Sequence, residues 1–192
     1  MHYLNQLEYP QMEYKHNMDE GGAGEHNTVA AAGCGPCSLC MVVEMLTPYT
    51  FTLDECIELS YSVRANRKPG TDLKLLAPAV AEKFGLAYTP SSNVGELIEH
   101  LQKGGMAVAN SGGDREGYTG VFTHGGHYIA VLSYADGEFC ILDPSWKEGK
   151  FEEEGRTGKV RVVYPYVYCA PEVLAKDCEN RTPSYYLFAR KK

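Results

Sequence analysis

The sequence predicts an α+β protein whose first half is helical and whose second half is an antiparallel sheet. Up to residue 103, apolar side chains recur at the three- and four-residue spacing of helices. From Met106 onward they fall in short runs separated by glycine-rich or charged loops, which is typical of strands. Helices followed by consecutive strands favour helices packed on an antiparallel sheet. The 192 residues suffice for one buried core, so residues 1–192 are expected to form a single domain.

Four helices are expected in the first half, at about residues 36–47, 52–63, 72–85 and 93–103. The first begins near Pro36, because a proline at a helix start lacks only an N–H that would have no helical partner. Thr52 is a residue type that caps helix starts, and Gly85 is a typical helix stop. The polar residues 1–30 are expected to lie as an extended segment on the surface.

Five strands are expected in the second half, at residues 106–110, 127–134, 138–143, 159–168 and 184–190. A glycine-rich segment, SGGDREGYTGVFTHGG at 111–126, precedes the second strand. It has no lysine and hydroxyl pair of the kind found in phosphate-binding loops. It is interpreted as either a mobile flap or an ordinary surface loop.

The charge balance argues against several classes of partner. The chain carries 18 basic and 25 acidic residues, a net charge of −7, and no basic block precedes Arg190–Lys192. Nucleic acid and anionic membranes are therefore not expected as partners. No run approaches the roughly 20 apolar residues that span a bilayer, and MHYLNQLEYP has no secretory pattern. As printed, the chain is expected in the cytoplasm, and it would be secreted if a leader had been removed. The sequence predicts no oligomeric state.

A cysteine at the start of the first helix is the candidate nucleophile. In GCGPCSLCMVVEML, residues 33–46, Cys34 lies between two glycines and just ahead of Pro36. The unpaired N–H groups and the dipole at a helix start favour an anion, so the pKa of this thiol should be lowered. The flanking glycines leave room for a substrate. The alternative is that Cys34 is one more buried core cysteine, the common fate of a free thiol.

A metal or redox site is a second alternative. Cys34, Cys37 and Cys40 form a CxxCxxC pattern of the kind found at zinc and iron–sulfur sites. On a helix, however, the three side chains would not converge, and no fourth ligand follows at a suitable spacing. No metal or other cofactor is therefore expected. The seven cysteines, odd in number and widely spread, indicate free thiols rather than a disulfide framework.

A thiolate nucleophile needs a base and a group that orients the base. His127 fits best because it opens a strand directly after two glycines, and His124 in the preceding loop is the spare. A three-residue hairpin loop at 135–137 is predicted, because it would place Ile129 opposite Asp143 and put His127 and Asp143 on one face. A two-residue turn would send the carboxylate to the other face. The alternative for Asp143 is that it only starts a turn with the proline that follows.

Taken together, GCGPCSLCMVVEML, GGHYIAVLSY and FCILDPS resemble the C39-like branch of the papain-like cysteine peptidases. The N-terminal YLNQLEYP is similar to that family's Tyr-x-Asn-Gln segment, so the resemblance covers nearly the whole chain. It implies a papain-like fold, with N-terminal helices packed on a C-terminal antiparallel sheet, and hydrolysis of a peptide or protein substrate. It also implies four roles: Cys34 as nucleophile, His127 as general base and then acid, Asp143 as the group that orients the imidazole, and Gln6 as the side-chain donor of the oxyanion hole.

Some features depart from the family pattern or leave choices open. Cys37 stands where the family usually has Thr or Ser, which leaves open a disulfide with Cys34 under oxidation. Gln11 is the alternative oxyanion donor if the N-terminal segment is threaded differently. Cleavage of double-glycine leaders is not implied, since the separation of Gln6 from Cys34 is long and the printed chain has no transporter sequence. An acyltransferase built on the same residues, or a catalytically silent module that binds peptides, remain the alternative functions.

Overall fold

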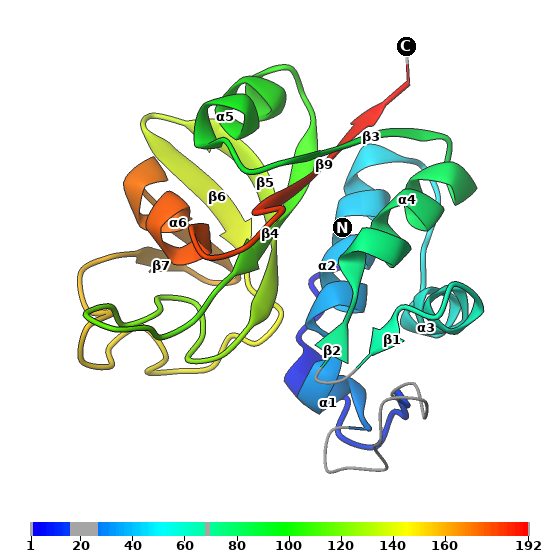
Figure 1. Ribbon diagram of the computed structural model, residues 1–192, viewed down its shortest axis with the longest axis horizontal. Helices are drawn as coiled ribbons and strands as arrows, with labels where there is room; N and C mark the ends of the chain where they lie inside the picture. The colour runs from blue at the N-terminus through cyan, green and yellow to red at the C-terminus, as the bar shows by residue number, and fades with distance from the viewer. Residues whose placement is uncertain (1, 16–26, 68–69, 192) are drawn as a thin grey trace.

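The computed structural model describes residues 2–15, 27–67 and 70–191, in which a seven-stranded sheet carries helices on both faces (Figure 1). Helices α1 to α4 lie on one face of the sheet, and α5 and α6 lie on the other. A short 3-10 helix, η1, precedes them at Gln6–Glu8. The helix bounds are α1 Val29–Ala32, α2 Cys34–Leu46, α3 Leu53–Ser62, α4 Leu73–Lys83, α5 Val94–Gln102 and α6 Pro171–Cys178.

Every neighbouring pair of strands in the sheet is antiparallel, in the order β3-β9-β4-β5-β6-β8-β7. The strand bounds are β3 Leu86–Ser91, β4 Met106–Ser111, β5 His127–Ala135, β6 Glu138–Leu142, β7 Arg161–Val163, β8 Tyr166–Cys169 and β9 Tyr185–Arg190. A separate two-stranded ribbon joins β1 Asn66–Arg67 to β2 Gly70–Thr71. The predicted fold class, helices packed on an antiparallel sheet, is therefore confirmed.

Alternate residues of the central strands face two different cores. Ala130 and Leu132 of β5 pack with α2, α3 and α4, while Ile129 and Val131 pack with α5 and α6. This division follows from the two-residue period of a strand. Strands buried on both faces read as continuous apolar runs, which is what the sequence has along β5.

Helix α2 is the central helix of the larger core. Every residue from Gly35 to Val43 is buried, which agrees with an apolar sequence on all sides of the helix. Ser38 Oγ donates to the carbonyl oxygen of Tyr128 at 3.3 Å, so the first turns of α2 lie beside the start of β5. A residue at the start of α2 and one at the start of β5 can therefore meet.

The expected helices agree with the structure, and their caps explain why. Thr52 and Glu55 form a capping box at the start of α3. Asp72 and Asn93 cap α4 and α5 by accepting hydrogen bonds from first-turn N–H groups. The first helix begins at Cys34 rather than near Pro36, which places the thiol inside the first helical turn.

One predicted strand is wrong in detail, and a further strand and a further helix were not expected. The strand expected at 159–168 is two strands, because the Tyr164–Pro165 segment turns the chain between β7 and β8. Strand β3 was not expected and pairs only with β9 at the sheet edge. Helix α6 was not expected either, although Pro171 at its first turn is a recognisable start signal.

The hairpin between β5 and β6 differs from the predicted three-residue loop. Ala135 pairs with Glu138, so the loop is the two-residue turn Asp136–Gly137, with φ of 51° and 82°. A β-bulge between Val131 and Ser133 then shifts the register by one residue, so that Ala130 pairs with Leu142. Continued by one residue, this register sets Ile129 opposite Asp143. The predicted turn was wrong, but the bulge restores the register that it was meant to produce.

The N-terminal segment does not lie on the surface as expected. Leu4 and Tyr14 are buried in the larger core, and Tyr14 OH hydrogen-bonds to Ser60 Oγ and Thr71 Oγ1, each at 2.8 Å. The turn-rich GGAG at 21–24 lies outside the described residues. Within the described ranges, no helix combines the length and the apolar character needed to cross a bilayer.

Candidate functional site

Cys34 is the first residue of α2, and it is partly exposed, unlike Cys37 and Cys40, which are completely buried. Gly33 is the N-cap of α2 and provides no capping side chain. The first N–H groups of the helix therefore have no side-chain hydrogen-bond acceptor at the cap. A Cβ on Gly33 would lie 2.6 Å from the carbonyl oxygen of Val29, which is too close for any other residue. The sequence GCG therefore allows α1 to meet α2 tightly at the thiol.

His127 is the first residue of β5, and Asp143 directly follows β6, as the bulged register requires. The imidazole Nε2 donates to Asp143 Oδ1 at 2.8 Å, since a carboxylate can only accept. His127 also forms a side-chain hydrogen bond with Cys34. Because Nε2 is bound to the carboxylate, Nδ1 is the ring nitrogen left to interact with the sulfur. The structure thus brings Cys34, His127 and Asp143 together in one chain of contacts.

The three groups shift one another's pKa in a consistent direction. Burial opposes ionisation of the Cys34 thiol, but the hydrogen bond and charge of His127 outweigh it and lower the pKa of Cys34 below 9.0. Burial also disfavours the imidazolium, yet the carboxylate of Asp143 and the contact with Cys34 raise the pKa of His127 above 6.5. A lowered thiol pKa and a raised imidazole pKa favour a thiolate–imidazolium pair.

Lys150 also belongs to this group, although its sequence context does not predict it. Its side chain is buried, and Nζ donates to Asp143 Oδ2 at 2.5 Å and to Ser145 Oγ at 2.8 Å. Ser145 in turn donates its backbone N–H to Asp143 Oδ1 at 2.9 Å and holds its Oγ 3.0 Å from His127 Nε2. Despite its burial, the pKa of Asp143 lies far below its usual range because Lys150 and His127 flank it. In sequence, Lys150 sits in the charged run KEGK and resembles a surface lysine.

Gln6 lies next to this group, but its amide does not line the cavity at Cys34. Its backbone N–H donates to the carbonyl oxygen of Pro144 at 2.6 Å. Its side-chain Nε2 donates to the carbonyl oxygen of Ala30 at 2.7 Å, and Oε1 has no partner among the described residues. Gln11, the alternative, is exposed. The role of Gln6 as oxyanion donor stays a prediction. One of the two N–H groups on Nε2 is used by Ala30, and the other remains to donate to an oxyanion.

A cavity of about 390 Å³ opens over the thiol. Cys34 and His127 line it together with residues of α1, the β2 ribbon, the end of β4 and the chain after α6. Its remaining walls are Ala31, Ala32, Gly70, Thr71, Asn110, Gly125, Gly126, Tyr128 and Arg181. Most of these side chains are small, which leaves the sulfur accessible to an extended substrate.

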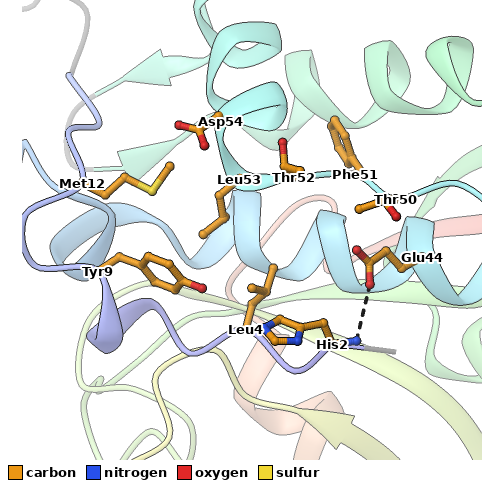
Figure 2. A pocket seen from close by; sticks show the side chains of 10 residues that line it. All are labelled: His2, Leu4, Tyr9, Met12, Glu44, Thr50, Phe51, Thr52, Leu53 and Asp54. Carbon is orange, nitrogen blue, oxygen red and sulfur yellow. Dashed lines mark hydrogen bonds between the residues drawn. The ribbon is translucent and has the colours of Figure 1, made fainter.

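A larger cavity of about 590 Å³ lies elsewhere, between the N-terminal segment, α2 and the start of α3. Figure 2 shows its apolar lining, which includes Leu4, Phe51 and Leu53, and the hydrogen bond from the His2 N–H to Glu44 Oε2. None of the predicted catalytic residues lines it. Size alone therefore does not mark the chemical site in this molecule.

The other cysteines and His124 lie in environments that differ from those of Cys34 and His127. All seven cysteines are free, and burial raises the pKa of the Cys37 and Cys40 thiols well above 9.0. Among the residues the structure describes, no group of three or more His, Cys, Asp or Glu side chains is arranged to hold a metal ion. His124 is exposed and pairs with Asp114 and Glu153, each at 2.8 Å, rather than with the thiol.

The glycine-rich segment before His127 is held in place by Asp177 of α6. This buried carboxylate accepts hydrogen bonds from the backbone N–H groups of Val121 at 2.6 Å and Phe122 at 3.3 Å, from Tyr118 OH at 3.0 Å, and from the Ser111 hydroxyl. The side chains of Val121 and Phe122 are completely buried in the smaller core. These contacts argue against the interpretation of 111–126 as a mobile flap, and the buried side chains also distinguish the segment from an ordinary surface loop.

The Asp177→Ala variant is expected to lower the free energy of unfolding by about 2–4 kcal/mol, because two buried N–H groups lose their acceptor. Urea unfolding measures this loss, and hydrogen exchange at the Val121 and Phe122 amides should accelerate. Glu179→Ala, which removes an exposed carboxylate two residues away, is the control and should change stability by less than about 1 kcal/mol. Equal effects of both variants would contradict the anchoring role.

Comparisons with known proteins agree with this architecture. No protein-family model matches the sequence, and no curated protein matches it significantly. The peptidase domain of Streptococcus ComA, an ABC transporter involved in quorum sensing, has a TM-score of 0.53 at 15% identity, over 82% of this chain and 91% of that one. A protein of Bacillus anthracis assigned as a C39-like peptidase has a TM-score of 0.56 at 12% identity, over 83% of this chain and 89% of that one. The chain therefore has the papain-like fold of C39 peptidase domains.

Proposed function

We propose that the protein is a cysteine peptidase that cleaves peptide bonds with Cys34 as nucleophile, His127 as base and acid, and Asp143 as the group that orients the imidazole. The observation that carries the proposal is the continuous chain of contacts from the Cys34 thiol through His127 to Asp143, with Nε2 and Oδ1 2.8 Å apart. The position of Cys34, which lines a cavity at the N-terminus of α2, supports the same conclusion. The structural neighbours named above share the fold of such enzymes.

In the first step, the Cys34 sulfur forms a bond with the carbonyl carbon of the scissile amide, whose oxygen becomes an oxyanion. The backbone N–H of Cys34 and the remaining N–H of the Gln6 amide are the proposed donors to this oxygen. When the C–N bond breaks, His127 gives its Nδ1 proton to the leaving amine, and a thioester remains.

In the second step, water attacks the thioester. His127, now neutral, takes a proton from the water, and the C–S bond breaks to release the carboxylic acid and the thiolate. Asp143 keeps Nε2 protonated throughout, so that the ring presents Nδ1 to the sulfur. An acyltransferase would follow the same first step and replace water by another nucleophile.

The proposal is tested by alkylation with iodoacetamide followed by peptide mass mapping. Cys34 should react faster than the other six cysteines at neutral pH, because its pKa is lowered while burial raises the pKa of thiols such as Cys37, Cys169 and Cys178. The preference should vanish in His127→Ala, and a peptide library should be cleaved by the wild type but not by Cys34→Ala. Indiscriminate labelling, or cleavage that persists in Cys34→Ala, would refute the proposal.

A further inference from the structure

We propose that Arg181 makes the enzyme selective for substrates that carry a carboxylate next to the scissile bond. The proposal rests on the proposed peptidase function and adds the chemical class of substrate. Arg181 lines the same cavity as Cys34 and His127. One of its terminal nitrogens, Nη2, lies 2.9 Å from the position that a Cβ on Gly126 would occupy. The guanidinium therefore lies directly against the residue that precedes His127.

The protein itself leaves the hydrogen-bonding capacity of this guanidinium largely unused. Nε of Arg181 is buried and has no hydrogen-bond partner within the described ranges. The hydrogen bond from Nη2 to the carbonyl oxygen of Gly112 is long, at 3.4 Å. A guanidinium has five N–H donors in a planar fork that matches a carboxylate. A guanidinium that lines a cavity and has so few partners within the protein is suited to an anionic ligand.

Arg181 lacks the ion pair that three other arginines of this acidic chain form. Arg115, Arg156 and Arg161 each form an ion pair with a glutamate, at 2.8, 2.9 and 2.5 Å. In the parts of the chain that the structure describes, no carboxylate is within ion-pair distance of Arg181. Arg190 forms no ion pair among the described residues either, but its Nε donates to the carbonyl oxygen of Leu46 at 2.6 Å, whereas Nε of Arg181 has no such partner.

The backbone around Arg181 is fixed, so the guanidinium is held near the cavity rather than on a free tail. The N–H of Arg181 donates to the carbonyl oxygen of Cys178 at 3.0 Å, and Ser184 Oγ donates to the carbonyl oxygen of Arg181 at 3.0 Å. The N–H of Asn110, at the end of β4, donates to the carbonyl oxygen of Ser184 at 2.9 Å. The segment around Arg181 is thereby attached to β4. Strand β4 pairs with β5, and β5 begins at His127.

A peptide offers a carboxylate from two sources, an Asp or Glu side chain or the terminal α-carboxylate. The chemistry that Arg181 recognises is the same for both. Binding of either would place a charged group at a defined distance from the sulfur and so choose which peptide bond reaches it. Recognition of an Asp or Glu side chain would give an endopeptidase that cleaves next to acidic residues. Recognition of the α-carboxylate would give an enzyme that removes C-terminal residues.

The first experiment compares alkylation of Cys34 by iodoacetate and by iodoacetamide, which differ by one carboxylate. It requires no turnover and so stays informative if the peptidase proposal fails. The ratio of the iodoacetate rate to the iodoacetamide rate should fall roughly threefold to tenfold in Arg181→Gln and further in Arg181→Glu. His127 stays in place in both variants, so its charge does not confound the comparison. Lys103→Glu, which makes the same charge change at an exposed site beyond the far end of β4, should leave the ratio unchanged.

The second experiment measures kcat/KM on paired peptides. The first set has amidated C-termini and compares Asp with Asn, and Glu with Gln, at the positions on each side of the scissile bond. The second set has neutral side chains and compares a free C-terminus with an amidated one. The wild type should prefer one source of carboxylate about tenfold to a hundredfold, and Arg181→Gln should abolish that preference while still cleaving the neutral peptides. Arg181→Glu should prefer a Lys at the same position.

The outcomes of these experiments separate the two proposals. An alkylation ratio that is the same in the wild type and Arg181→Gln, or equal cleavage of carboxylate and amide peptides by the wild type, would overturn the role of Arg181 even if Cys34 is an active nucleophile. A changed ratio without cleavage of any peptide would support anion recognition and refute peptidase activity. Circular dichroism and thermal unfolding of each variant confirm that it is folded.

Discussion

Replacing His127 with alanine is expected to lower kcat/KM for peptide hydrolysis by about a thousandfold or more. The variant loses both the group that receives and returns the proton and the charge that stabilises the thiolate. Burial of Cys34 persists, and it raises the pKa of the thiol once the hydrogen bond and charge of His127 are gone. Stopped-flow measurement of hydrolysis, together with iodoacetamide alkylation as a function of pH, checks both effects.

The pH dependence has a direction that follows from the two shifts. In the wild type, the thiolate–imidazolium pair exists above the lowered pKa of Cys34 and below the raised pKa of His127. The acid limb of activity, where Cys34 ionises, should therefore be centred below pH 9.0. The alkaline limb, where His127 loses its proton, should be centred above pH 6.5, with a plateau between the two limbs. Both limbs belong to the coupled pair rather than to either residue alone. In His127→Ala the acid limb of alkylation should move to higher pH and the plateau should disappear.

His124→Ala is the matched control. His124 lies three positions earlier, is exposed, and pairs with Asp114 and Glu153 instead of the thiol. The variant should keep the wild-type pH profile and rate within about twofold. If both histidine variants reduced activity equally, or if the alkylation profile of His127→Ala matched the wild type, the assignment of His127 would be wrong.

Much of this site could be predicted because it depends on local signals. The helix start at Cys34, the strand start at His127 and the Asp-Pro turn at Asp143 are each visible over a few residues. The register between the two strands was harder to predict. The turn at Asp136–Gly137 has the two-residue form that a DG pair favours, and the bulge near Leu132 compensates for it. A bulge within a continuous apolar run has no clear sequence signal. The predicted register at Asp143 was therefore correct although the predicted turn was wrong, because the bulge makes the one-residue shift that was assigned to the turn.

Strand β3 and helix α6 were missed for different reasons. Strand β3 contains Pro90, which argues against a central strand, and its only partner is β9 near the C-terminus. An edge strand with one distant partner and mostly partial exposure has little periodicity of its own. Helix α6 is short, and its signal, a proline at the first turn followed by Glu172, is local and was available.

Lys150 could not be found from sequence for a different reason. Lysines are rarely buried, so a lysine that follows a glycine at the end of the charged run KEGK indicates a solvated loop. Its burial becomes reasonable only when Asp143 and Ser145 are seen beside it, since the carboxylate and hydroxyl supply the partners that a buried ammonium requires. The consequence is that Asp143 is held between two cationic groups rather than between His127 and solvent.

Lys150→Met is expected to lower the free energy of unfolding by about 3–5 kcal/mol at neutral pH, because it leaves the buried charge of Asp143 with one partner instead of two. Urea unfolding measures the loss. Lys147→Met removes an exposed lysine from the same loop and should change stability by less than about 0.5 kcal/mol. The double variant Asp143→Asn/Lys150→Met should lose less than the sum of the two single variants, since neither charge is then left alone.

The loss from Lys150→Met should itself depend on pH, with a sign set by Asp143. Because its pKa in the folded protein lies below the ordinary value of 3.8, the paired carboxylate stabilises the fold fully above that value and progressively less as the pH falls. The difference in stability between wild type and Lys150→Met should therefore be constant near neutrality and shrink below pH 3.8. Without Lys150, the uncompensated carboxylate should also raise the pKa of His127 further and move the alkaline limb of activity to higher pH. A variant with wild-type stability and an unchanged alkaline limb would show that Lys150 does not act on the His127–Asp143 pair.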